Sequence, residues 1–283
     1  MTETWLQIAV VVLVVAMTGS MGVELEPADF RRVLRQPRAT IVGLSGQLLL
    51  LPVLTIAFAY LGGLEAELAA GAMIIAACPG GPPSNVFTFL AGANTALSIT
   101  LTALSSVLTI LTTPLWIWVG IRLFLHDSAT VEIPVERVVG QLFFVILVPI
   151  AAGMSLRAKR PAWAARIRRH LRPVLATTMA ASFVLIVLSQ GSSLVYELRD
   201  AAPAAAALSV LALGTAQMWG RLWGLSTIDA FTVSIEVGLQ NGALAALIVV
   251  NLLGRLDLIA FPGAYALIAF VPVTIWTAWF RRR

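Results

Sequence analysis

The chain is organised as long apolar runs separated by short polar segments. Backbone groups find no water partners inside a bilayer, so an apolar run that crosses it must form a closed helix. A helix needs about 20 residues to do so, and each run is near or above that length. The pattern predicts a single transmembrane domain over residues 1–283 with nine spans, at about 5–22, 39–61, 67–91, 95–124, 138–155, 173–191, 201–222, 228–253 and 257–280.

The first run is expected to be a true span rather than a cleaved signal peptide. It has no basic residues at its start, Glu3 is its only charged residue, and no small-residue cleavage site follows before Glu24. A signal peptide would need a basic region at its start and a small-residue cleavage site, and this run has neither.

Two spans are interrupted in their middle. The third contains the string CPGGPPSN at residues 78–85, and proline and glycine at this density should break a helix. The eighth contains EVGLQNG at residues 236–242, which places a carboxylate and two amides at similar depth. If spans 1–4 and 6–9 are two halves, each broken helix is the third of its half. Interrupted spans in matching positions predict an inverted repeat with a carrier's binding site between the breaks, and span 5 has no partner.

Composition places the protein in lipid. The chain is 59% hydrophobic and 12% charged, with a mean hydropathy of +0.92. A soluble domain carries roughly 25% charged residues, so this chain has too little polar surface to be a water-soluble globule. We therefore expect an all-α polytopic membrane protein. Cys78 is the one cysteine, which excludes an intrachain disulfide.

The basic residues are distributed unevenly between the two sides that the spans define. One side carries only Arg122, Arg137, Arg199 and Arg255. The other side carries the remaining ones: Arg31, Arg32, Arg35, Arg38, Arg157, Lys159, Arg160, Arg166, Arg168, Arg169, Arg172, Arg221, Arg281, Arg282 and Arg283. Because cytoplasmic loops are enriched in Lys and Arg, this predicts a plasma (inner) membrane protein with its N-terminus outside and its C-terminus in the cytoplasm. The basic clusters are thus interpreted as topology determinants rather than a nucleic-acid surface.

Glu236 is the only acidic residue expected in the interior of a span, since the other acidic residues fall in loops or at span ends. A charge at the bilayer centre costs at least ~2.5–3.5 kcal/mol. No Lys, Arg or His lies in the interior of a span to balance it, since Arg122 and Arg221 stand at span ends and both His126 and His170 fall in loops. Glu236 is therefore either balanced by a cation, or protonated, or a neutral acid hydrogen-bonded between helices.

Oxygen-bearing side chains that suit a hard cation cluster around the two breaks. Ser98 and Thr102 are four residues apart and share a helix face. The other candidates lie next to a break or alone in an apolar run: Gln47, Ser84, Asn85, Gln240 and Asn241. Each has a simpler interpretation on its own, because membrane Ser and Thr often bond their own helix and a lone Gln can join helices. The clustering favours a cation site.

Several strings together resemble the bile acid:sodium symporter family, from about residue 5 to 280. They are GSMGVEL at 19–25 with Asp29-Phe30, Gly46-Gln47 before Leu51-Pro52, CPGGPPSN at 78–85, ALSITLTALSS at 96–106 and EVGLQNGALA at 236–245. The resemblance implies a panel domain and a core domain, with two crossed discontinuous helices in the core. It also implies import of an organic anion together with two sodium ions, and loss of the first helix of ten-span bacterial relatives.

The resemblance also assigns roles to residues by position. One sodium site would comprise Ser84, Asn85, Ser98, Thr102 and Glu236. The other would comprise Gln47, Glu236, Gln240 and backbone oxygens near Val237 and Leu239.

Two positions depart from the family pattern on the substrate side. Pro82 and Pro83 stand where the family usually has a threonine and a small residue. Asn241, Gly242 and Ala243 stand where it usually has Asn-Ser-Gly, and Asn241 matches a substrate-facing position. Pro82, Pro83, Asn241 and Gly242 are therefore the candidate substrate contacts. The bound anion, bile-acid-like or a small carboxylate, would lose a hydroxyl contact at each place.

Sodium-coupled symport of an organic anion by alternating access is the favoured function. The principal alternative is a proton-coupled carrier in which Glu236 titrates, and a passive anion channel is a weaker one. An intramembrane enzyme is disfavoured, because the spans contain no aspartate pair, serine with a His or Lys base, or HExxH zinc motif.

Overall fold

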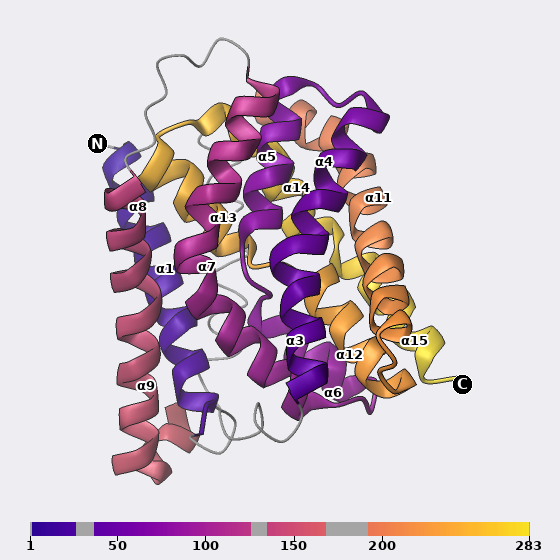
Figure 1. The fold of residues 1–283 in the computed structure, drawn as a ribbon. Coiled ribbons are helices and arrows are strands. Elements are labelled where there is room, and N and C mark those ends of the chain that lie inside the picture. Colours follow the sequence, from indigo (N-terminus) through magenta and orange to yellow (C-terminus); the bar gives the residue numbers. More distant parts are fainter. Residues whose placement is uncertain (1, 27–36, 126–134, 168–191, 283) are drawn as a thin grey trace.

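The computed structural model describes residues 2–26, 37–125, 135–167 and 192–282. These ranges form an elongated bundle of helices that run along a common direction (Figure 1). The elements of its first half are α1 (Thr2–Glu24), α3 (Pro37–Ser45), η1 (Gly46–Leu50), α4 (Leu51–Gly62), α5 (Ala66–Ala77), α6 (Pro82–Leu90) and α7 (Thr95–Phe124). Those that follow are α8 (Val135–Leu142), η2 (Phe143–Leu147), α9 (Val148–Lys159), α11 (Ser192–Leu222), α12 (Thr227–Gly238), α13 (Gly242–Leu247), η3 (Ile248–Leu253), η4 (Leu256–Leu258), α14 (Ala260–Ile268) and α15 (Phe270–Phe280).

The described ranges contain six helices long and apolar enough to cross a membrane. They are Gln7–Glu24, Pro37–Gly62, Thr95–Phe124, Val138–Lys159, Leu198–Leu222 and Leu256–Phe280, which match the first, second, fourth, fifth, seventh and ninth predicted spans. The third and eighth correspond to the shorter pairs α5–α6 and α12–α13 with η3. The sixth predicted span, 173–191, lies outside the described residues.

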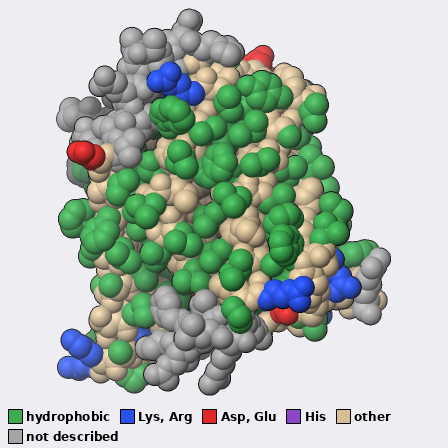
Figure 2. Space-filling model, in the orientation of Figure 1, with side chains coloured by type: hydrophobic (Ala, Val, Ile, Leu, Met, Phe, Trp, Pro, Cys, Tyr) green, Lys and Arg blue, Asp and Glu red, His purple; other side chains and the backbone are tan. Residues whose placement is uncertain are grey.

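The surface of the bundle agrees with a lipid environment. Figure 2 shows a face on which hydrophobic side chains cover the middle, with Lys, Arg, Asp and Glu toward the two ends. Large apolar side chains point outward on several helices, among them Leu61, Leu111 and Ile275, which are 89%, 68% and 64% exposed. Exposed apolar area of this extent is typical of a surface that contacts lipid. The protein is a multi-pass, all-α membrane protein in the part of the chain that the structure describes.

The segments that interrupt the two broken helices meet at the crossing of α5–α6 with α12–α13. Helix α5 ends at Ala77 and α6 begins at Pro82, where a proline in the first turn gives up only an amide that has no helical partner. Helix α12 ends at Gly238 and α13 begins at Gly242. The connecting segments are extended and pair antiparallel at Gly80 and Gln240. Two backbone hydrogen bonds fix the crossing, Gly81 N to Leu239 O at 3.2 Å and Asn241 N to Pro79 O at 3.0 Å.

Helices α1 and α9 pack backbone to backbone at one side of the bundle (Figure 1). A Cβ added at Gly22 would lie 2.2 Å from Ile150 O, and one added at Gly153 would lie 2.4 Å from Gly19 O. The obstructing atoms belong to the backbone and have no freedom to move aside. Glycine at both positions therefore permits this close contact.

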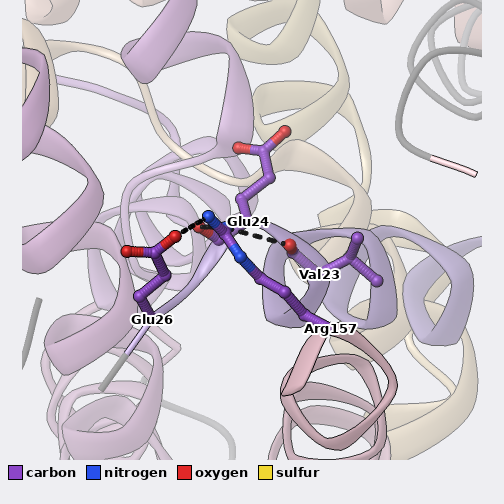
Figure 3. Close-up of polar contacts among 4 residues, drawn as sticks. All are labelled: Val23, Glu24, Glu26 and Arg157. Atoms are coloured by element: carbon purple, nitrogen blue, oxygen red, sulfur yellow. Dashed lines mark hydrogen bonds and ion pairs between the residues drawn. The ribbon is translucent and has the colours of Figure 1, made fainter. Parts of the chain in front are cut away.

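Arg157 of α9 caps the C-terminal end of α1 (Figure 3). Its guanidinium donates to Val23 O at 3.2 Å and to Glu24 O, and it forms an ion pair with Glu26. The last carbonyls of a helix have no intrahelical partner, and a cation near them is favoured by the helix dipole. The positive-inside interpretation gave Arg157 only a topological role, whereas the structure shows that it also joins α9 to the end of α1.

We predict that Gly153→Ala destabilises the protein, because the added methyl group must push α1 away from α9. Overpacking of this kind costs about 1–3 kcal/mol. The measurement is thermal unfolding of the purified protein in detergent. Gly140→Ala is the matched control, since a Cβ there has nothing within 4 Å. Equal unfolding temperatures for the two variants would contradict the close-packing argument.

Candidate functional site

The Glu236 carboxylate is buried where α12 approaches α6 and α7. Glu236 is 1% exposed and lies in the last turn of α12. Three hydroxyl groups donate to it: Ser84 to Oε2 at 2.6 Å, Ser98 to Oε2 at 3.2 Å and Thr102 to Oε1 at 2.6 Å. Each carboxylate oxygen therefore has at least one donor.

Asn85 completes the first group of predicted ligands. Its Oδ1 lies 2.8 Å from Ser98 Oγ and 3.4 Å from Thr102 Oγ1, so it and Glu236 are alternative acceptors for the single proton of each hydroxyl. Ser84 and Asn85 lie in the first turn of α6, whereas Ser98 and Thr102 lie on one face of α7. The structure thus brings together the five side chains that the sequence assigned to one sodium site.

Thr88 is a member of this cluster that the sequence reasoning missed. It is fully buried, and its Oγ1 donates to Ser98 Oγ at 3.4 Å. Ser84 and Thr88 are four residues apart, so they share a face of α6. The four-residue spacing in the sequence could therefore have indicated that Thr88 lies beside Ser84 in the cluster.

The second group of predicted ligands surrounds a pair of glutamines. Gln47 Nε2 donates to Gln240 Oε1 at 2.8 Å, and Gln240 Nε2 donates back to Gln47 Oε1 at 3.2 Å. Gln47 also donates to Cys78 O at 2.9 Å, and Gln240 donates to Val237 O at 2.7 Å. Gln47 therefore links a third helix to both broken helices. The carbonyl of Leu239, in contrast, accepts the crossing hydrogen bond from Gly81 N.

A wide helical turn brings Gln47 to the crossing. The second span changes from α3 to the π-helical segment η1 at Gly46 and returns to α-helix at Leu51. π-turns inside longer helices are frequent at functional sites. The carbonyl of Leu48 within this turn accepts from Trp116 Nε1 at 2.9 Å, which ties the segment to α7.

Gly80 leaves room for the carboxylate. A Cβ at this position would lie 2.2 Å from Glu236 Oε1 and 2.7 Å from its Cδ. The first break therefore supplies hydroxyl donors from α6, and its lack of a side chain at Gly80 gives Glu236 the space to reach them.

The chemistry of this cluster suits a hard monovalent cation. Within the described residues, Glu236 forms no ion pair with Lys, Arg or His. The same ranges contain no group of three or more His, Cys, Asp or Glu of the kind that holds a transition metal. Carboxylate, amide and hydroxyl oxygens surround the site instead, and a hydroxyl that donates to Glu236 keeps lone pairs for a cation.

The candidate substrate contacts lie beside the crossing. Pro82 and Pro83 form the start of α6 and are partly buried. Asn241 is the N-cap of α13 and its side-chain oxygen accepts from Leu244 N at 3.1 Å. At Gly242, a Cβ would lie 2.4 Å from the Ala266 Cβ of α14, so this glycine has a packing role. Their contact with a substrate stays a prediction.

Comparison with known proteins decides the family. A model described as the Sodium Bile acid symporter family matches residues 10–197, more than half of the chain. The chain belongs to the sodium bile acid symporter family. The predicted resemblance is confirmed, and because the relatives are named as sodium-dependent transporters and cotransporters, the protein is a transporter rather than an enzyme.

Individual relatives include proteins named as sodium-dependent transporters or cotransporters. The chain is 29% identical over 254 residues to the uncharacterized sodium-dependent transporter YocS of Bacillus subtilis, a match covering 86% of this chain and 74% of that one. It is 26% identical over 277 residues to the ileal sodium/bile acid cotransporter of Cricetulus griseus, covering 93% and 76%. It is 31% identical over 271 residues to the P3 protein of Bos taurus, covering 89% of this chain but only 54% of that protein. The chain thus spans about half the length of the P3 proteins.

We predict that Gly80→Ala abolishes sodium-induced stabilisation of the purified protein. The new methyl group would occupy the position of the Glu236 carboxylate, which must leave its three hydroxyl donors. The measurement is the unfolding temperature as a function of sodium chloride, with choline chloride holding ionic strength constant. Gly214→Ala serves as the control, since a Cβ there meets nothing within 4 Å. A sodium response in Gly80→Ala equal to that of the control would contradict the proposed geometry.

Proposed function

We propose that the protein is a secondary active transporter that couples sodium entry to symport of an organic anion by alternating access. The observation that carries this proposal is the buried Glu236 with its ring of hydroxyl and amide oxygens. An unbalanced carboxylate at membrane depth is costly, and a bound cation removes that cost. Family membership and the names of sodium-dependent relatives support sodium as the cation.

Two sodium ions bind on either side of Glu236 in this proposal. The first contacts Ser84, Asn85, Ser98, Thr102 and Glu236. The second contacts Gln47, Gln240, Glu236 and the carbonyl oxygens of Val237 and Leu239. The hydrogen bonds that gather each group support the division, because Asn85 belongs to one network and the glutamine pair to the other.

The organic anion binds beside the crossing, at the N-terminal end of α6. This helix spans nine residues from Pro82; its first two residues are prolines without an amide hydrogen, and the Ser84 amide donates to Gly81 O at 2.9 Å. The positive end of the helix dipole attracts a carboxylate or sulfonate. Pro82 and Pro83 offer no side-chain hydroxyl, so Asn241, Gly242 and apolar contacts provide the rest of the site. A bile-acid-like or small carboxylate substrate fits this combination.

The moving parts are a panel and a core arranged as an inverted repeat of nine spans. Helices α1 and α9 with η2 pack together and form the described part of the panel. The two broken helices with α3, α4, α7, α11, α14 and α15 form the core. Movement of the core against the panel exposes the crossing to one side of the membrane and then the other.

The basic end of the bundle faces the cytoplasm in this proposal. Arg38 lies beside the loop after α11, where a Cβ on Gly224 would be 2.6 Å from its Nη2. At the other end, Glu65, Glu67, Asp200 and Asp257 line a cavity of about 280 Å³. Because Lys and Arg are retained on the cytoplasmic side, this arrangement supports an external N-terminus.

Proton coupling through Glu236 is the second candidate. The single observation in its favour is that Glu236 is buried without a basic partner among the described residues. Against it, a titrating carboxyl group does not require the conjunction of Ser84, Asn85, Ser98 and Thr102 around it.

We predict that an imposed sodium gradient at constant pH drives uptake of an organic anion into proteoliposomes, and that a pH gradient at equal sodium does not. Glu236→Gln should abolish the sodium-driven uptake, because it removes the charge shared by both sites. Radiolabelled taurocholate and a panel of small carboxylates are the substrates to measure. Thr55→Val is the control, since the Thr55 hydroxyl donates to the carbonyl of Leu51 in its own helix at 2.8 Å. Uptake that follows the pH gradient instead would favour the proton-coupled carrier.

We also predict opposite accessibility for two cysteine substitutions in intact cells. Glu65→Cys should react with an impermeant maleimide, whereas Lys159→Cys should react only after permeabilisation. The native Cys78 is fully buried, so the background labelling should be low. Labelling of Lys159→Cys from outside would reverse the proposed orientation.

A further inference from the structure

Each break leaves a carbonyl at the end of a half-helix that has lost its helical partner. At the first break, Ala77 O accepts from Thr113 Oγ1 at 2.7 Å. At the second break, Gly238 O accepts from Tyr265 Oη at 3.0 Å and from Ser209 Oγ at 3.3 Å. Thr113, Ser209 and Tyr265 are all buried. Hydroxyl groups from other helices therefore take the place of the missing backbone amides.

The two breaks use the same arrangement. Ala77 is the last residue of α5, and its donor comes from α7, the next membrane helix after the broken one. Gly238 is the last residue of α12, and Tyr265 comes from α14, which again follows the broken helix. The same solution at matching positions of the two halves indicates a requirement of the crossing itself.

Close packing sets these hydroxyls in place. A Cβ at Gly238 would lie 2.5 Å from Leu213 Cδ2 of α11, and one at Gly242 would lie 2.4 Å from the Ala266 Cβ of α14. The absence of side chains at both glycines lets α11 and α14 reach the break. Ser209 and Tyr265 lie one turn and one residue, respectively, from these contact points.

The held carbonyls are adjacent to the second proposed sodium site. Gly238 lies between Val237 and Leu239, and Ala77 precedes Cys78, whose carbonyl accepts from Gln47. Ala77 and Gly238 are the last residues of α5 and α12, so anchoring their carbonyls limits how far the end of each half-helix, and the carbonyls next to it, can move. The Gly238 anchor thus directs Val237 O, which Gln240 already contacts at 2.7 Å, and the Ala77 anchor directs Cys78 O.

We propose that Tyr265 and Thr113 are positioning residues for the sodium site formed by Gln47, Gln240 and the Val237 carbonyl. Neither touches the ion. Each holds the end of a half-helix so that the carbonyl and amide oxygens next to it converge. Ser209 assists Tyr265 at the same carbonyl. The proposal rests on the proposed function, because it assigns these hydroxyls a role in the sodium affinity of that site.

The test is equilibrium sodium binding to the purified full chain without organic substrate, measured by competition with radioactive sodium. Tyr265→Phe keeps the ring and removes one hydrogen bond, and it should weaken sodium binding about 5- to 10-fold. Thr113→Val should also weaken sodium binding. Thr113→Ser, which keeps the hydroxyl group, should bind sodium nearly as well as the unaltered protein. The matched controls are Tyr60→Phe, at a residue that is 57% exposed, and Thr55→Val, at a buried hydroxyl that bonds its own helix. Neither control should change sodium binding.

A double substitution separates positioning from general packing. Tyr265→Phe acts through the oxygens beside Gln240, so it should add almost nothing once Gln240→Ala has removed that site. A merely structural hydroxyl would instead lower the unfolding temperature in both backgrounds and leave sodium affinity unchanged, which would overturn the proposal. If Tyr265→Phe does not fold, Ser209→Ala tests the same carbonyl and should weaken sodium binding. Unchanged binding there would also overturn the proposal.

The sodium-binding measurement gives different results if the positioning role is wrong and if the proposed function is wrong. If the unaltered protein binds no sodium, the proposed function fails. If it binds sodium and neither Tyr265→Phe nor Thr113→Val weakens that binding, the function stands and the positioning role is wrong.

Discussion

The central constraint on this structure is the free-energy cost of burying the Glu236 carboxylate within the membrane. Glu236 is buried with hydroxyl donors on both oxygens and no ion pair in the described ranges. Hydrogen bonds from Ser84, Ser98 and Thr102 stabilise the charge but do not neutralise it. A cation that binds there therefore contributes to the stability of the folded protein as well as to transport.

The crossing places the ends of the broken helices, with their polar groups, beside the Glu236 carboxylate. Breaking two spans costs backbone hydrogen bonds, and unpaired carbonyls cannot be left in a membrane. The broken ends recover partners from each other, through Gly81 with Leu239 and Asn241 with Pro79. Other carbonyls recover partners from neighbouring helices, as Cys78 does from Gln47. Because the second span, α7 and α14 all donate hydrogen bonds at the crossing, the proposed ion site and the packing of the helices depend on the same contacts.

The sequence predicted the features that come from local chemistry. Prolines and glycines at 79–83 located the first break, and the rarity of a carboxylate in an apolar span singled out Glu236. Residues that act through distant packing were not predicted. The bonds from Tyr265 and Ser209 to Gly238 depend on how closely α11 and α14 approach, and no periodicity encodes that distance. The π-turn that positions Gln47, and the cap that Arg157 forms on α1, likewise require the folded backbone.

The isolated charge of Glu236 has a consequence for the response to membrane voltage. In the proposed cycle the loaded centre contains Glu236, two sodium ions and one monovalent anion, and these charges cancel. The unloaded centre retains one negative charge. The membrane field therefore acts mainly on the return of the unloaded carrier, with about 2.3 kcal/mol available per elementary charge for a full crossing at 100 mV. An inside-negative potential moves that charge outward and so accelerates the resetting step, which places the electrogenic event of the cycle after substrate release.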